Sequence, residues 1–238
     1  IFDDGTIKDV TASGSVDGKD NVGGVVGESF VPITDASASG NVSGENNVGG
    51  VVGETRAPIT NASASGKVSG NDDVGGVVGK TSASITHAST SGKINGRNHV
   101  GGIAGISEQT IVHVTAVSDV YGTDDVGGVV GENENGIVRD VSASGNVTGS
   151  TRVAGIVGLN DGITANASTS GVIIGNDRVG GGIGQNNGLA VNVTASESID
   201  RSDNVSSLVG KNNGAIRQAF NVDTGTTQGL DIKYDPNS

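Results

Sequence analysis

A six-residue segment rich in glycine and valine, VGGVVG or a close variant, occurs eight times along the chain. The copies begin at Val22, Val48, Val74, Val100, Val126, Val153, Val179 and Val205. Successive copies are 26 residues apart, except for one interval of 27 residues between Val126 and Val153. A fixed period of roughly 20 to 50 residues is typical of repeat architectures, in which each unit stacks on its neighbours. The sequence therefore predicts a single repeat domain over residues 1–238.

Each repeat consists of short β-prone segments separated by turn residues. The unit that starts at Val22 reads VGGVVGESFVPITDASASGNVSGENN, and Gly40 and the GENN segment interrupt its strands. No segment keeps a helical period of apolar residues, and the 42 glycines among 238 residues disfavour helices throughout. Aromatic residues make up 2% of the chain, and Met and Trp are absent, so we expect a thin core of Val, Ile and Ala.

Three columns of apolar residues emerge when the repeats are aligned, and we expect them to face inward. They comprise Val16, Val42, Val68, Ile94, Val120, Val147, Ile173 and Ile199; Val25, Val51, Val77, Ile103, Val129, Ile156 and Leu208, with Gly182 as the exception; and Ala36, Ala62, Ala88, Val114, Val141, Ala167 and Val193. The predicted fold is an all-β β-solenoid (β-helix) with about 26 residues per coil, eight to nine coils and capped termini. Phe2 and the tail at 222–238 are the expected caps, and Phe220 interrupts a column of Ser and Thr.

Composition narrows the possible functions. The net charge of −12 argues against binding to nucleic acid or to an anionic membrane, and no apolar run reaches the roughly 18 residues of a membrane span. Cysteine is absent, which excludes disulfides and Cys-ligated metals and fits a secreted bacterial protein. The sequence contains no HExxH, GxSxG or P-loop motif. We expect a protein that is not an enzyme, has no cofactor or metal, and is monomeric or a mature fragment of a longer chain.

Gly24-Val25-Val26-Gly27 and the stretch VGENENGIVRDVSASGNVTG from Val130 to Gly149 resemble the GLUG repeat. The resemblance extends from about Asp4 to Asn221. It implies an extracellular repeat module with no chemistry of its own, as in bacterial surface adhesins and the non-catalytic parts of secreted peptidases. GLUG repeats often carry an aromatic residue in the strand before Thr-Gly, whereas this chain has Ser or Thr there until Phe220.

Two columns of small hydroxyl residues form the strongest candidate for a binding face. They lie two residues apart in each repeat, and alternation along a strand would turn both columns outward. Hydroxyls would be about 4.8 Å apart between coils and roughly 7 Å apart along each strand. The candidate residues are Thr11, Ser13, Ser37, Ser39, Ser63, Ser65, Ser89, Ser91, Thr115, Ser142, Ser144, Ser168, Ser170, Thr194 and Ser196, with Val117 as the exception.

Two functions fit such a face. The first is a rigid spacer or binding face in a surface adhesin-like protein, with a surface ligand as the partner. The alternative is an ice-binding solenoid whose partner is an ice crystal plane, because the spacing resembles the Thr-x-Thr faces of ice-binding β-solenoids. Ser occupies most positions, so most of them lack the methyl group of Thr.

Two further columns carry groups that could bind metal ions. One comprises Asp20, Asn46, Asp72, Asn98, Asp124, Thr151, Asp177 and Asp203, whose oxygens could bind calcium or simply form turns. The other places His87 and His113 in adjacent repeats, in a column of Asp and Asn. No third or fourth ligand accompanies the two histidines, so we expect a hydrogen-bonded polar ladder there.

Overall fold

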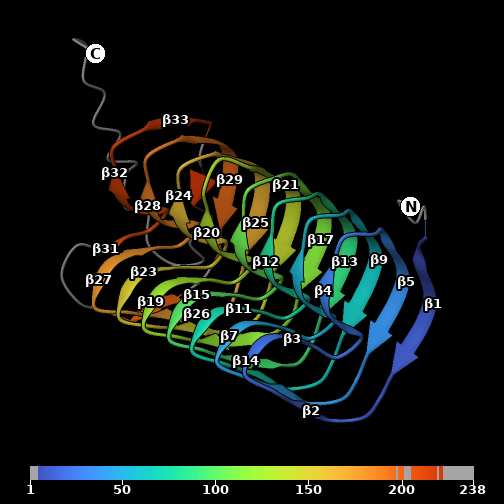
Figure 1. The fold of residues 1–238 in the computed structure, drawn as a ribbon. Helices are drawn as coiled ribbons and strands as arrows, with labels where there is room; N and C mark the ends of the chain where they lie inside the picture. The colour runs from blue at the N-terminus through green and yellow to red at the C-terminus, as the bar shows by residue number, and fades with distance from the viewer. Residues whose placement is uncertain (1–4, 197, 201–204, 219, 222–238) are drawn as a thin grey trace.

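The computed structural model describes residues 5–196, 198–200, 205–218 and 220–221. These residues form a parallel β-solenoid in which each repeat is one coil and the coils stack along a single axis (Figure 1). The predicted β-solenoid and its period are therefore confirmed. None of the described residues forms a helix long and apolar enough to cross a membrane. The predicted caps at Phe2 and at 222–238 lie outside the described residues.

Each of the eight complete coils contributes one strand to each of four parallel sheets, and β33 and β34 add to the first of these sheets. Sheet 1 contains the longest strands: β1 (Ile7–Ala12), β5 (Ile33–Ala38), β9 (Ile59–Ala64), β13 (Ile85–Thr90), β17 (Ile111–Ala116), β21 (Ile137–Ala143), β25 (Ile163–Thr169), β29 (Leu189–Ala195), β33 (Ala215–Arg217) and β34 (Phe220–Asn221). Sheet 2 contains β2 (Val16–Asp17), β6 (Val42–Ser43), β10 (Val68–Ser69), β14 (Lys93–Asn95), β18 (Asp119–Tyr121), β22 (Val147–Thr148), β26 (Val172–Ile174) and β30 (Ser198–Asp200).

The other two sheets complete the coil. Sheet 3 contains β3 (Asp20–Gly23), β7 (Asn46–Gly49), β11 (Asp72–Gly75), β15 (Asn98–Gly101), β19 (Asp124–Gly127), β23 (Thr151–Ala154), β27 (Asp177–Gly180) and β31 (Val205–Ser206). Sheet 4 contains β4 (Val26–Ser29), β8 (Val52–Thr55), β12 (Val78–Thr81), β16 (Ala104–Ser107), β20 (Val130–Asn133), β24 (Val157–Asn160), β28 (Ile183–Asn186) and β32 (Val209–Asn212).

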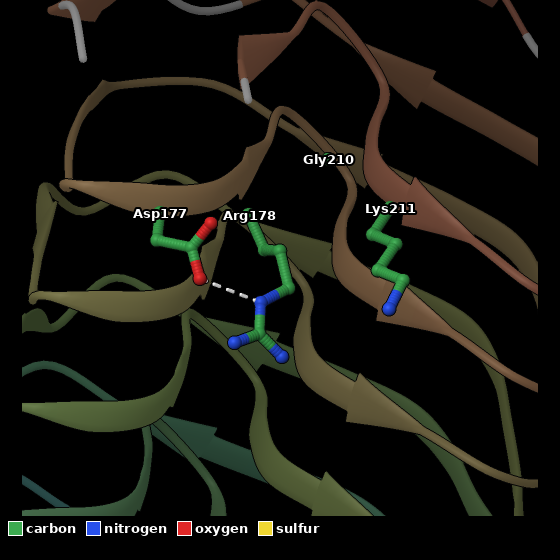
Figure 2. Close-up of a pocket in the computed structure, with 4 residues that line it drawn as sticks. All are labelled: Asp177, Arg178, Gly210 and Lys211. Atoms are coloured by element: carbon green, nitrogen blue, oxygen red, sulfur yellow. Dashed lines mark hydrogen bonds and ion pairs between the residues drawn. The ribbon is translucent and has the colours of Figure 1, made fainter. Parts of the chain in front are cut away.

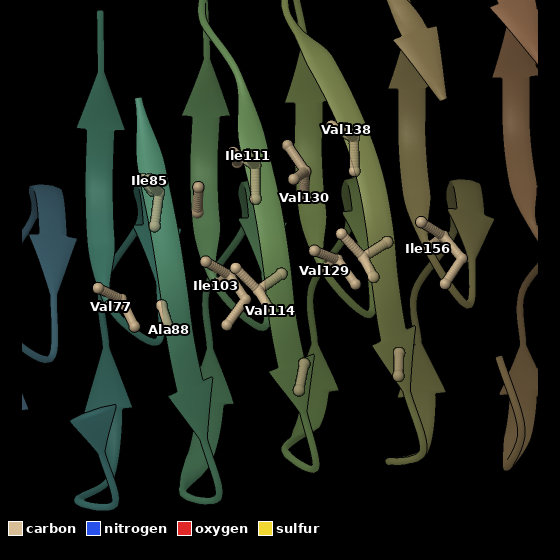
Figure 3. Close-up of a cluster of buried hydrophobic side chains, with 14 of the residues drawn as sticks. Val77, Ile85, Ala88, Ile103, Ile111, Val114, Val129, Val130, Val138 and Ile156 are labelled. Atoms are coloured by element: carbon tan, nitrogen blue, oxygen red, sulfur yellow. The ribbon is translucent and has the colours of Figure 1, made fainter. Parts of the chain in front are cut away.

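The apolar columns divide into two separate cores. One core lies between sheets 1 and 4 and includes the Val51 and Ala36 columns, as Figure 3 shows for the middle coils. The other lies between sheets 2 and 3 and includes the Val42 column together with the first valine of each VGGVVG segment. Val42, Val68 and Ile94 are each 1% exposed, and Val68 pairs with both of the others. The predicted inward columns are therefore buried in the interior coils, although they fill two cores rather than one.

The double glycine of VGGVVG lies at the bend between these cores. Val48 belongs to the core of sheets 2 and 3, whereas Val51 and Val52 belong to the core of sheets 1 and 4. A Cβ atom on Gly49 would lie 2.1 Å from the carbonyl oxygen of Val52, and one on Gly50 would lie 2.2 Å from that of Gly76. Glycine favours such a close approach of backbones, and the one exception among the buried equivalents of Gly49 is Ala154 in β23, which still carries only a methyl group. The segment recurs because every coil passes from one core to the other at this bend.

Left-handed backbone conformations occur twice in each of the first seven coils, and residues other than glycine adopt them. The column in sheet 1, here called the outer left-handed column, comprises Asp9, Asp35, Asn61, His87, His113, Asp140, Asn166, Asn192 and Gln218. The column just before each VGGVVG, here called the bend column, comprises Asn21, Asn47, Asp73, His99, Asp125, Arg152 and Arg178. Their φ angles lie near 50°, a region in which Asn, Asp and His are enriched among non-glycine residues.

The 27-residue interval arises in one turn between sheets 4 and 1. Ser107 pairs with Asn133 at a spacing of 26, whereas Ile111 pairs with Val138 at a spacing of 27, so the extra residue lies between Asn133 and Val138. From this coil onward the last residue of the sheet 4 strand is Asn rather than Ser or Thr, and Asn133, Asn160 and Asn186 are buried. Asn133 donates a hydrogen bond of 2.8 Å to Asn160, which donates another of 2.8 Å to Asn186.

Candidate functional site

The first hydroxyl column lies on the outer surface of sheet 1. Consecutive members pair directly in the sheet, from Thr11 opposite Ser37 through to Ser168 opposite Thr194. All eight members are exposed or half-buried, while from Ser37 onward the residues on either side of each, such as Ala36 and Ala38, are buried. Phe220 pairs with Thr194 and so continues this column in β34.

The second hydroxyl column lies immediately beyond the ends of the sheet 1 strands. The Ser39 amide donates to the Ala12 carbonyl at 2.9 Å, and the corresponding amides continue this ladder along the solenoid. Its serine members are exposed except for Ser170, which is half-buried. Val117 is 52% exposed and introduces an apolar group into the hydroxyl column. Together the two columns form an outward, uncharged strip, here called the hydroxyl face.

Some of the hydroxyls interact with each other. Ser63 donates to Ser37 at 3.1 Å, and Ser142 donates to Thr115 at 3.3 Å. These are side-chain bonds between adjacent coils, and they leave part of each hydroxyl's hydrogen-bonding capacity available to solvent. The hydroxyl face thus offers regularly repeated donors and acceptors but no acid, base or nucleophile activated by a neighbour.

The outer left-handed column borders the hydroxyl face. Asn192 donates to Asn166, and Asn166 donates to Asp140, each at 3.0 Å. The rings of His87 and His113 stack with their centroids 5.1 Å apart. The column is therefore a ladder of hydrogen-bonded and stacked polar side chains. The Asn166 hydrogen bond is the main cause that lowers the pKa of Asp140, and Arg139 acts in the same direction.

The predicted Asp and Asn turn column lies at the start of the sheet 3 strands. The Asn46 amide donates to Asp20 at 2.6 Å, and the Asn98 amide donates to Asp72 at 2.5 Å. Amides thus alternate with carboxylates, which places a donor beside each of these acceptors. Asp203 of this column lies outside the described residues.

The structure also brings together a cluster of ionisable residues from the bend column and from β20, which the sequence did not predict. Nδ1 of His99 lies 2.7 Å from Oδ1 of Asp73 in the preceding coil. Nε2 lies 3.3 Å from Oε2 of Glu132 and 3.7 Å from Oδ2 of Asp125, both in the following coil. Arg152 forms a two-pronged ion pair with Asp125, in which Nη2 lies 2.7 Å from Oδ2. The 26-residue spacing of Asp73, His99 and Asp125 could have revealed this arrangement.

Burial and ion pairing shift the pKa values in this cluster. The hydrogen bond to Asp73 is the main cause that raises the pKa of His99, with further contributions from the charges of Glu132 and Asp125 and with burial opposing the rise. Burial raises the pKa of Asp125, although Arg152 opposes this effect, and burial likewise raises that of Glu132. The bond to Asp125 raises the pKa of Arg152. The site therefore concentrates negative charge where water is partly excluded.

The bend column continues to a pocket near the C-terminal end of the described coils. Asp177, Arg178, Gly210 and Lys211 line it (Figure 2). Nε of Arg178 lies 2.7 Å from Oδ2 of Asp177, and Nη1 donates to Oε1 of Gln185 at 2.9 Å. The arginine is thus held by neighbouring side chains.

The stacked coils and the repeating surface columns define the chain as a parallel β-solenoid repeat module. Residues 122–148 match the family model of the GLUG motif. This stretch spans β19, β20, β21 and β22, which is one turn around the solenoid. Because the coils on both sides pair with it in register, they repeat the same structural unit. The resemblance to the GLUG repeat is therefore confirmed. No curated protein and no solved structure shows significant similarity to the chain.

Proposed function

We propose that this chain is a non-catalytic, extracellular module of a bacterial surface protein, in which it acts as a rigid spacer that displays the hydroxyl face to a surface ligand. The observation that supports this proposal best is the continuous stack of coils. Both cores extend along the rod, and backbone hydrogen bonds join each coil to the next. A bend between two coils would strain the backbone hydrogen bonds of the sheets on its outer side.

The composition and the motif support an extracellular location. The chain lacks cysteine and carries a net charge of −12, which favours solubility on an exposed surface. The GLUG resemblance points to surface adhesins and to secreted peptidases. Antibodies against the chain should label intact source cells. Labelling only after lysis would contradict the proposed location.

The spacer role can be tested by measuring distances along the rod. The absence of native cysteine allows pairs of spin labels to be attached at introduced cysteines. Ser13→Cys with Ser196→Cys spans seven coil steps, about 34 Å, and Ser39→Cys with Ser170→Cys spans five, about 24 Å. Double electron–electron resonance spectroscopy should give a narrow distribution of spin–spin distances for each pair, and the two mean distances should differ by about 10 Å. Broad or overlapping distributions would show that the rod bends.

Ice binding is the second candidate function, and the hydroxyl face is the observation that favours it. Its members pair in register from Thr11 to Thr194, which sets a regular spacing of hydroxyls along the rod. An ice plane requires such two-dimensional regularity without charge. Ser predominates over Thr in both columns, so the spacer with a surface ligand remains our first proposal.

Thermal hysteresis separates the two candidates. If the face binds ice, Ser89→Tyr and Ser142→Tyr should sharply reduce hysteresis while leaving the melting temperature nearly unchanged, because both side chains reach solvent. Substitutions at Lys67 and Lys93, which are exposed in the neighbouring column, should have little effect. Wild-type protein without hysteresis would exclude ice binding and leave the first proposal.

A further inference from the structure

The His99 cluster brings together three potential metal ligands from two adjacent coils. Nε2 of His99, Oδ2 of Asp125 and Oε2 of Glu132 belong to a group whose ligand atoms all lie within 4.8 Å of one another. Asp125 contributes a side chain that is 3% exposed, whereas His99 is 30% exposed and gives access from solvent. These atoms belong to side chains that the stacked coils hold in fixed register.

The spacing of these atoms fits a bound cation better than it fits a hydrogen bond. Charge-assisted N–H···O bonds are about 2.7–2.9 Å long, as is the 2.7 Å contact of His99 with Asp73. The two contacts of Nε2 are longer, at 3.3 and 3.7 Å. Two ligands of a tetrahedral ion with bonds of about 2.1 Å are separated by about 3.4 Å. The Nε2 side of the ring therefore has the spacing of a coordination sphere.

Asp73 sets the imidazole in the state that a metal requires. A carboxylate that accepts the Nδ1 proton leaves the lone pair of Nε2 as the ligand, which is the common arrangement around metal-bound histidine. When a metal ion displaces the proton from Nε2, the freed lone pair faces two carboxylate oxygens, and the ion between them offsets their repulsion.

The single positive charge of Arg152 does not neutralise all the carboxylates of the cluster. Its guanidinium pairs with Asp124 and Asp125, but Asp73 and Glu132 add two further carboxylates to the cluster. Oxygen ligands of metals are commonly hydrogen-bonded by a second residue, which is the role that Arg152 would have toward Asp125.

We propose that His99, Asp125 and Glu132 bind one divalent transition-metal ion of the zinc type, with Asp73 orienting the histidine. A nitrogen ligand with two carboxylates suits zinc, whereas calcium takes six to eight oxygen ligands. The ion would join adjacent coils on the outside of the solenoid, away from the hydroxyl face.

Isothermal titration calorimetry of the purified chain with zinc chloride tests this site. We expect saturable binding of one ion per chain, lost in His99→Asn and in Glu132→Gln. Asp73→Asn should weaken binding by about 10- to 100-fold, which is typical of residues that orient a ligand. Both ligand variants should fold. Asn already occupies the bend column at position 47, and Gln185 occupies the position equivalent to Glu132 two coils further along the solenoid. Circular dichroism checks their folding.

The matched controls are His113→Asn and Glu54→Gln, which make the same changes elsewhere. Asn already occupies the outer left-handed column at positions 61 and 166, and Glu54 lies in the same register as Glu132. Both controls should bind zinc as the wild type does. Absence of saturable zinc binding in the wild type, or binding that persists in folded His99→Asn, would overturn the proposal, as would binding lost in His113→Asn.

Discussion

At the scale of single residues, the left-handed positions show why polar side chains replace glycine there. Glycine would adopt φ near 50° without steric cost, but it could not interact with the next coil. The side chains at these positions do so: Asn192 donates to Asn166, and Arg152 pairs with Asp125. These side-chain contacts between coils offset the steric cost of the left-handed conformation. Because the same conformation recurs from coil to coil, the contacts recur with it.

Asp140 provides a pH-dependent test of such a ladder. Its folded-state pKa is lowered, so its ionised form stabilises the fold above the ordinary pKa of about 3.9, and this contribution is lost as the pH falls through the lowered value. Asp140→Asn should therefore lower the melting temperature at pH 6 and have a much smaller effect near pH 2. A difference that stays constant over this range would contradict the assignment. The Asn side chain fits, because Asn166 occupies the same column.

Gly50 tests the close approach at the bend. A Cβ atom there would lie 2.2 Å from the Gly76 carbonyl oxygen and 2.7 Å from the Cβ of Ala64. Gly50→Ala should destabilise the protein by about 2 kcal/mol, a typical cost of overpacking. Gly14→Ala is the control, because nothing lies within 4 Å of the added atom. Chemical denaturation that shows equal stability for both variants would mean that the bend is not tightly packed.

At the scale of strands, stability comes from columns that continue from coil to coil. Sheet 2 strands are only two or three residues long, so each depends on the buried residue that it adds to the column. Val68 in β10 lies between Val42 and Ile94 and is 1% exposed. Packing between coils, rather than within one coil, therefore holds these strands in place.

Val68→Asp should break this column. The substitution buries a carboxylate without a partner, which costs several kcal/mol. We expect unfolding or a large fall in melting temperature. Lys67→Asp is the control, because residue 67 is exposed next to the same position. A melting temperature that Val68→Asp leaves unchanged would show that the column does not support the strand.

The sequence predicts much at this scale, because parallel in-register stacking converts a 26-residue period directly into a column. The buried Val68 and the exposed Ser89 both follow from this rule alone. The two cores could not be predicted from it, since the spacing does not show that Gly49 and Gly50 bend the chain between them. The contacts of His99 with Glu132 were missed for the same reason, because they cross that bend.

At the scale of the whole molecule, the fold is nearly one-dimensional: strands pair with the coils before and after them. Stability in such proteins is approximately a sum over repeats and their interfaces. Length should therefore change in whole coils, with little effect on the coils that remain.

Deletion of residues 48–73 should leave a folded rod that is shorter by about 4.8 Å. Asn47 would then precede Val74, and the columns would continue in register. Deletion of residues 48–60 removes half of the coil and should prevent normal stacking, because it shifts every later column. The two deletion variants can be compared by far-UV circular dichroism for β-structure, by melting temperature for stability and by small-angle X-ray scattering for length. Equal behaviour of both deletions would contradict the in-register stack.

The extra residue between Asn133 and Val138 has a consequence for how such a rod can acquire new surfaces. The turn from sheet 4 to sheet 1 absorbs the residue locally, and pairing resumes on both sides of it. This turn can therefore lengthen in one coil without disturbing the next. Evolution can therefore change the length and sequence of these turns one coil at a time, which places different loops on the surface of an otherwise unchanged solenoid.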